Sequence, residues 1–399
     1  MKRKWLLGES EKWVNEGIIR PEQRTAIMNR YQQQDRLPLM FFLSALFIGL
    51  ACLSLVAANW QVIPELIRML VIILFLFAFY MLGHVFEQKG KLNYGVFCYI
   101  VALMVFGAGI FLTGQMYHYT MNNVFAFIVW GLAAFLLYTS RPNIMIYLTG
   151  LAIVTTGTIY GLSNMHAFDW WLFALFIVAY GSVVWTQKRL MISYIFSIAY
   201  LIQLLGFTLD QLNEFYWFGL FILLLYVVGL IIKTHPISQP FQRVSLLAMF
   251  IFVLIQTMLM ELSFNPEHHT VYYIVLLLLI IFGAIISYHR YDLLKSLQLV
   301  IFLPVFALND GAQLSAYIVL FIFSITTLLD GYQKHDDRKF HIGTATFLIT
   351  TFLVYMQVAW GFLNQSLFFF VGGIILFIIG FLLERKRKVM AGQKREGGV

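Results

Sequence analysis

Eight polar side chains that could bind a ligand lie near the ends of long apolar segments of the chain. Amide, hydroxyl, imidazole and carboxylate groups at such positions predict a polar cavity on the outer side of a membrane, with a cationic, polar or lipid-headgroup ligand. The competing interpretation is that helix ends and outer loops are polar because they are wet. Glu65 and Arg68 are three residues apart, so they can pair on one helix face. The eight residues are Gln115, Tyr117, His118, Asn122, Glu65, Arg68, Asp169 and Asp210.

Motifs of soluble enzymes and metal sites are missing from the sequence. It holds no G-x-x-x-x-G-K-[ST], no H-E-x-x-H and no G-x-S-x-G. Glu267, His268 and His269 are adjacent, and adjacent residues in a short loop rarely bind one ion together. The two cysteines, Cys52 and Cys98, both lie in apolar segments. We therefore expect no metal site, no disulfide framework and no cofactor.

The composition indicates whether these groups belong to a water-soluble protein or to a membrane protein. Of 399 residues, 61% are hydrophobic and 12% are charged, against about 45–50% and about 25% in an ordinary soluble domain. These values exclude a water-soluble fold, a disordered chain and a coiled coil. The continuous apolar segments lack the period-two alternation of a barrel, so they predict membrane-spanning helices.

Charges and turn residues divide the chain into about fourteen apolar segments, each close to the ~20 residues that a bilayer requires. The sequence thus predicts an all-α, polytopic integral membrane protein with about 14 transmembrane helices. The expected spans are 39–58, 66–86, 94–114, 121–139, 143–162, 168–186, 190–208, 215–232, 243–261, 270–288, 294–309, 313–330, 341–360 and 365–383.

The distribution of basic residues predicts the orientation. If the N-terminus is cytoplasmic, every lysine and arginine except Arg68 falls on the cytoplasmic side, and a missed span would destroy this pattern. Both termini are therefore expected in the cytoplasm, and on the outer side acidic residues outnumber basic ones. The net charge of +8 and pI of about 9.3 then reflect topology, so no nucleic-acid partner is needed. The basic tail, 385–399, is expected to lie against anionic inner-leaflet lipid.

Three regions follow from this topology: a cytosolic helical hairpin at 1–38, a transmembrane bundle at 39–384 and the cytosolic tail. In the hairpin, a helix from Glu9 to Glu16 with Ser10 as its cap is expected, then a second helix from Pro21. So small a hairpin cannot bury a stable core alone. It packs on the inner loops, lies on the lipid surface or docks a protein partner.

The expected span at 294–309 is short and contains Pro304. Its fourteen residues between Lys295 and Asp310 reach only about 21 Å as a helix. A short kinked span is the favoured interpretation, and a broken helix that lines a cavity is the alternative.

The N-terminal segment also carries a family resemblance. Several short motifs resemble those of a bacterial family of predicted multi-spanning membrane proteins of unknown function. They are Trp13, Gly17-Ile18-Ile19, Glu22-Gln23, Gly107-Ala-Gly109, Gly114-Gln115-Met-Tyr117-His118, Trp130 and Ser140-Arg141. The resemblance covers about the first 140 residues. It implies a multi-pass protein of the bacterial cytoplasmic membrane, and it implies no activity.

Three functions remain open from the sequence. A transporter or flippase of a polar or lipid-linked solute is favoured, because many spans, no large domain and a polar outer layer fit it, although the spans hold few ionisable residues at mid-membrane. A membrane-embedded transferase acting on a lipid-linked substrate would use His118, Asp169, Asp210 or Glu214 as its base or nucleophile. A non-catalytic scaffold or sensor would use the hairpin.

Overall fold

The computed structural model describes most of the chain as helix, and no strand occurs in the described part. Two of the expected spans, 39–58 and 365–383, lie outside the described residues except for isolated positions. The described residues are 2–24, 44, 47, 64–116, 124–212, 214–232, 235–260, 269–290, 292–359, 370, 373, 374, 377, 378 and 381.

Within those residues, nine helices are long and apolar enough to cross a membrane, and three shorter apolar helices accompany them. The shorter ones are Phe125–Ser140, Trp217–Ile231 and Leu293–Phe302. An all-helical membrane protein is thereby confirmed, and the number fourteen stays a prediction. The nine are Glu65–Gln88, Leu92–Gly114, Ile144–Met165, Trp170–Gln187, Leu190–Asp210, Ser238–Met258, Thr270–Arg290, Ala312–Gln333 and Asp337–Gln357.

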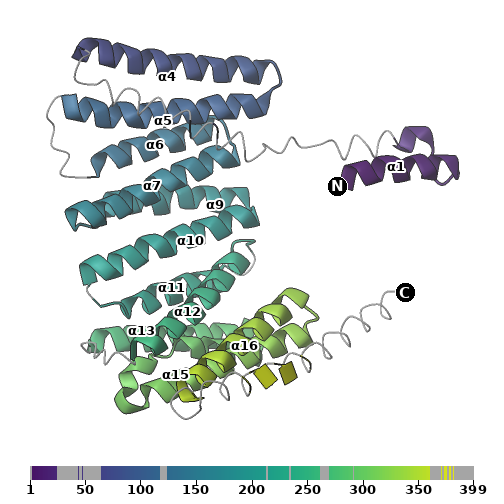
Figure 1. The fold of residues 1–399 in the computed structure, drawn as a ribbon, viewed down its shortest axis with the longest axis vertical. Helices are drawn as coiled ribbons and strands as arrows, with labels where there is room; N and C mark the ends of the chain where they lie inside the picture. The colour runs from purple at the N-terminus through teal and green to yellow at the C-terminus, as the bar shows by residue number, and fades with distance from the viewer. Residues whose placement is uncertain are drawn as a thin grey trace. The chain divides into compact units, whose positions relative to one another are not determined.

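The chain forms two compact units, Met1–Ile153 and Val154–Val399. The first contains α1 (Lys2–Asn15), α4 (Glu65–Gln88), α5 (Leu92–Met116), α6 (Phe125–Ser140) and the start of α7 (Ile144–Met165). In this unit α4, α5 and α6 lie side by side (Figure 1).

Helices α4 and α5 pack closely because glycines face each other across the hairpin. A Cβ atom on Gly95 would lie 3.0 Å from the carbonyl oxygen of Gly83, and one on Gly83 would overlap the Tyr99 ring. Such small residues let the backbones of membrane helices approach. In the same unit the Trp130 indole lies over Gly107 and donates a hydrogen bond to the Leu103 carbonyl at 2.9 Å.

The N-terminal helix is longer than the sequence suggests. Helix α1 already begins at Lys2, so Ser10 lies inside it and is not its cap. The expected end at Gly17 agrees with the structure, where this residue has φ +71°, a conformation that favours glycine. Residues 21–24 start a second helix as expected. Arg24 bonds back to the Ser10 hydroxyl at 3.4 Å and thereby joins the two segments.

The second unit is a series of antiparallel helices, two of which contain π-helical turns. Helix α10 (Leu190–Phe207) continues into the π-helix η2 (Thr208–Leu212). The remaining elements are α8 (Trp170–Leu175), the π-helix η1 (Phe176–Tyr180), α9 (Gly181–Gln187), α11 (Trp217–Ile231), α12 (Ser238–Met260), α13 (Thr270–Arg290), α14 (Leu293–Leu297), η3 (Gln298–Phe302), η4 (Val305–Gly311), α15 (Ala312–Gln333) and α16 (Asp337–Ala359).

Buried polar side chains join several of these helices. The Gly229 carbonyl on α11 accepts hydrogen bonds from Ser238 and Gln242 on α12, at 2.7 and 2.9 Å. Gln203 on α10 accepts from the Thr158 hydroxyl on α7 at 3.0 Å. In a bilayer, where no water competes, each such bond keeps a polar group satisfied as two helices meet.

The segment around Pro304 is broken. Leu303 has φ −62° and ψ 137°, the extended conformation that a following proline imposes. The 3₁₀-helices η3 and η4 flank this residue, and both pack on α15. No continuous helix therefore runs through this segment, as the broken-helix alternative expects. The cavity of that alternative stays a prediction.

Side-chain contacts place the helix ends of the second unit at two opposite ends. We call one of them the basic end. It contains the last residues of α9, α11, α13 and α15 and the first residues of α10, α12 and α16. For example, Arg290 at the end of α13 donates to the Leu230 carbonyl of α11 at 3.1 Å. The other, the acidic end, holds the start of α8, the turn η2 and the starts of α11 and α13.

Candidate functional site

The acidic end brings the candidate residue Asp210 into contact with a histidine that is far from it in the sequence. Nδ1 of His166, after α7, lies 3.0 Å from Oδ1 of Asp210 in η2. His166 has φ 49°, in the left-handed region, and its side chain is exposed, whereas that of Asp210 is only 20% exposed. The π-helical turn of η2 carries Asp210, and such turns are frequent at functional sites.

Asp169 has a structural role at the same end. It is the N-cap of α8, and its Oδ1 accepts the backbone N–H of Leu172 at 2.8 Å. An N-cap of this kind contributes about 1 kcal/mol to a helix. This capping contact explains why an acidic residue occupies position 169, and the explanation requires no ligand.

The six remaining candidates belong to the first unit, residues 1–153. Glu65 and Arg68 start α4 in the first unit, and no ion pair joins these two described side chains. Gln115 lies in α5, and its side chain is outside what the structure describes. Tyr117, His118 and Asn122 lie outside the described residues. The cavity predicted from all eight residues therefore stays a prediction.

Beside η2, the acidic end has an open hollow of about 590 Å³. Leu212, Trp217, His269, Thr270 and Val271 line it. Two of these residues are aromatic: the Trp217 and His269 rings have their centroids 6.4 Å apart. The hollow therefore combines ring faces with polar groups at the starts of α11 and α13.

A carboxylate and an aromatic cluster flank this hollow. Glu214 precedes α11, and its charge acts on Tyr216 next to the hollow. Trp217 meets Tyr272 edge-on at 5.2 Å, and Tyr272 donates to the Tyr216 carbonyl at 3.3 Å. These contacts hold the Trp217 ring in place.

The first unit contains a second charged contact, between α4 and the end of α6. Arg141 Nε donates to Glu87 Oε2 at 2.7 Å, and the Tyr99 hydroxyl donates to the same oxygen at 2.9 Å. The pair is partly exposed, so it adds little to stability by itself. It does fix the turn between α4 and α5 against the turn after α6.

The family match covers this part of the chain. Residues 11–147 match the family described as "Predicted membrane protein (DUF2157)". The match confirms the resemblance inferred from Trp13, Gly17 and Arg141, and it identifies a membrane protein of unknown function. No curated protein and no solved structure matches the chain. The second unit, where the hollow and the basic end lie, is entirely outside the matched residues.

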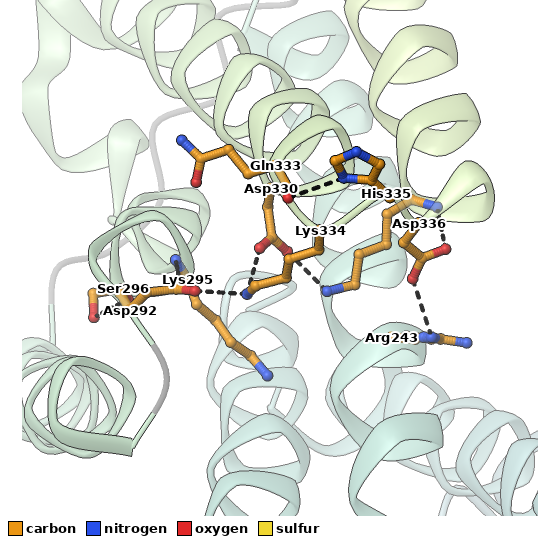
Figure 2. A network of polar contacts seen from close by, with 10 residues as sticks. Arg243, Asp292, Lys295, Ser296, Asp330, Gln333, Lys334, His335 and Asp336 are labelled. Carbon is orange, nitrogen blue, oxygen red and sulfur yellow. Dashed lines mark hydrogen bonds and ion pairs between the residues drawn. The ribbon is translucent and has the colours of Figure 1, made fainter. Parts of the chain in front are cut away.

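An ion-pair network at the basic end was not predicted from the sequence. Asp330, near the end of α15, is only 1% exposed; its two oxygens lie 2.6 Å from Lys334 Nζ and 2.8 Å from Lys339 Nζ. Lys334 also lies 2.7 Å from Asp292, so it bridges two carboxylates (Figure 2). The signal in the sequence was an aspartate inside an apolar segment with a lysine four residues later.

The network continues to α12 and surrounds a further lysine. Arg243 of α12 lies 4.0 Å from Asp336 (Figure 2). Asp336 directly precedes α16 and accepts the backbone N–H of Arg338. The charges of Lys339, Lys334 and two aspartates, Asp330 and Asp292, also act on Lys295 of α14. The network thus ties α12, α14, α15 and α16 together at one end of the unit.

Among the described residues, no group of three or more histidine, cysteine, aspartate or glutamate side chains could hold an ion.

Proposed function

We propose that the protein is a transporter or flippase that recognises a cationic or polar group at the acidic end of its second unit. The observation that supports this proposal is the hollow beside Trp217. The ring quadrupole of tryptophan attracts cations, and Asp210 and Glu214 add negative charge in the adjoining turns. His269 contributes a second ring to the same hollow.

A transport assay with the full chain tests this function. The protein is reconstituted in liposomes, and uptake of tetraethylammonium is measured beside flipping of a headgroup-labelled phosphatidylethanolamine. Trp217→Leu should lower the active signal about five- to thirtyfold, the value of a partly desolvated cation–π contact. Trp171→Leu is the matched control, because Trp171 starts α8 at the same end and is highly exposed.

The outcomes separate cleanly. Loss on Trp217→Leu with an unchanged Trp171→Leu control supports the proposal. Absence of both activities in the wild-type protein, or equal loss in both variants, overturns it. Asp210→Asn and Glu214→Gln should each give a smaller loss, because these carboxylates act on the ligand at longer range.

We also propose the finer topology: about fourteen spans, both termini in the cytoplasm and a bacterial cytoplasmic membrane. Its support is the sorting of charge in the second unit, where Lys188, Arg243 and Lys334 lie at one end and Asp169 and Asp210 at the other. Single cysteines at Lys188 and Asp169, labelled in intact cells with a membrane-impermeant maleimide, test it. Labelling at position 169 alone is expected, and labelling at 188 contradicts the orientation.

A further inference from the structure

An apolar groove opens on the side of the second unit, towards its basic end. Its volume is about 310 Å³, and it is lined by η1, α9, α10, α11 and α12. Its walls include Trp185, Phe196, Tyr200, Leu224, Val228 and Phe241. Trp185 and Leu224 are exposed on the outside of the unit. The groove therefore opens towards the space that lipid chains occupy around a membrane helix.

Two local features keep this space open. The π-helical turn η1 (Phe176–Tyr180) interrupts the regular α-helical register before α9. The next residue, Gly181, lines the groove without a side chain, and a Cβ atom there would lie 3.6 Å from the Phe196 ring. A larger side chain at this position would project into the groove.

A buried hydrogen-bond donor lies next to the groove. The His235 ring stacks on Trp185, with centroids 4.6 Å apart and planes at 9°. Its Nδ1 accepts the backbone N–H of Ile237 at 3.4 Å, which assigns the proton of the neutral ring to Nε2. Nε2 is buried and has no hydrogen-bond partner within the described part of the chain. Buried polar groups normally have a partner.

The same end of the groove is basic. Lys188 and Arg189 directly follow α9, three and four residues after Trp185, and both are exposed. No acidic residue occurs between Asp169 and Asp210 in the sequence. The salt bridges of the described residues leave both cations without a carboxylate. Basic residues at a membrane surface attract anionic lipid.

We propose that this groove binds one acyl chain of an anionic phospholipid. The acyl chain lies against Leu224, Val228 and Phe241. A headgroup or ester oxygen accepts a hydrogen bond from Nε2 of His235. Lys188 and Arg189 neutralise the charge of the phosphate. The site is at the opposite end of the unit from the hollow at Trp217. A negative result for lipid binding at this site therefore leaves the transport proposal unaffected, and the reverse also holds.

Native mass spectrometry of the detergent-purified full chain tests this site with phosphatidylglycerol and phosphatidylcholine as probes. The wild-type protein should retain one phosphatidylglycerol more tightly than phosphatidylcholine. His235→Phe keeps the ring on Trp185 and removes the donor, so it should reduce that preference about three- to tenfold. Leu224→Trp should fill the groove and lower the retention of both lipids.

The control is Leu278→Trp, which places the same side chain on an exposed face of α13. Its lipid retention should match that of the wild-type protein. Two results overturn the proposal: an unchanged phosphatidylglycerol preference in His235→Phe, or equal lipid retention in Leu224→Trp and Leu278→Trp. Because His235→Phe preserves the size of the ring, it keeps the test valid even if Leu224→Trp does not fold.

Discussion

Replacing Asp330 by asparagine tests whether the network at the basic end holds the second unit together. The substitution keeps the shape of the side chain and removes the charge that faces Lys334 and Lys339 at 2.6 and 2.8 Å. An amide in its place leaves two ammonium groups with a weaker acceptor.

The magnitude follows from burial. Breaking a fully buried ion pair costs about 3–5 kcal/mol, and an exposed pair contributes less than about 1 kcal/mol. Asp330 is 1% exposed, but Lys334 and Lys339 are 40% and 28% exposed, and Lys334 keeps Asp292. We therefore expect a loss of about 2–3 kcal/mol in the free energy of unfolding. For a unit of this size that lowers the melting temperature by about 4–12 °C.

The assay is the thermal unfolding of the full chain in detergent, followed by the loss of the monodisperse peak in size-exclusion chromatography. Asp336→Asn is the matched control, since this residue is more exposed and lies 4.0 Å from Arg243; asparagine also preserves its cap of α16. Lys339→Met combined with Asp330→Asn should destabilise less than the sum of the two. An Asp330→Asn variant that melts within about 1 °C of the wild-type protein would refute the reasoning.

Two further predictions concern the second unit. Gly343→Ala should destabilise it by about 1–3 kcal/mol, because the new Cβ would lie 2.5 Å from the Leu328 Cα, whereas Gly311→Ala, with open space around it, should be neutral in the same thermal assay. Gln203→Leu should cost only about 0.6 kcal/mol, since Thr158 can still donate to the Val154 carbonyl; a loss above about 2 kcal/mol in urea unfolding would contradict this.

The positions of the helices in the described residues were largely predictable from the sequence. An apolar segment of about twenty residues has few alternatives in a membrane, so the expected spans 66–86 and 270–288 coincide with α4 and α13. The π-turns in η1 and η2 were not predictable, because a change of register inside a uniformly apolar segment leaves no mark in the residue pattern.

The site was predictable only in part. The sequence predicted Asp210 near an outer helix end, but its contact with His166 joins residues 44 positions apart and depends on how α7 packs against α10. The sequence also singled out Asp169, whose role proved local. The environment of Asp330 depends on α14, α15 and α16 at once, so a scan of separate segments could not reveal it.

The break at Leu303 and Pro304 constrains how the protein can be assembled. A helix satisfies its own backbone, but the extended residue and the 3₁₀ turns around it expose amide and carbonyl groups that hydrocarbon cannot satisfy. Their protein cover comes from both sides of the segment in the sequence. Tyr226 of α11 packs on Phe302 and Tyr272 of α13 packs on Phe306, and α15 follows later in the chain. We therefore expect this segment to enter the bilayer together with neighbouring helices and not as an independent span.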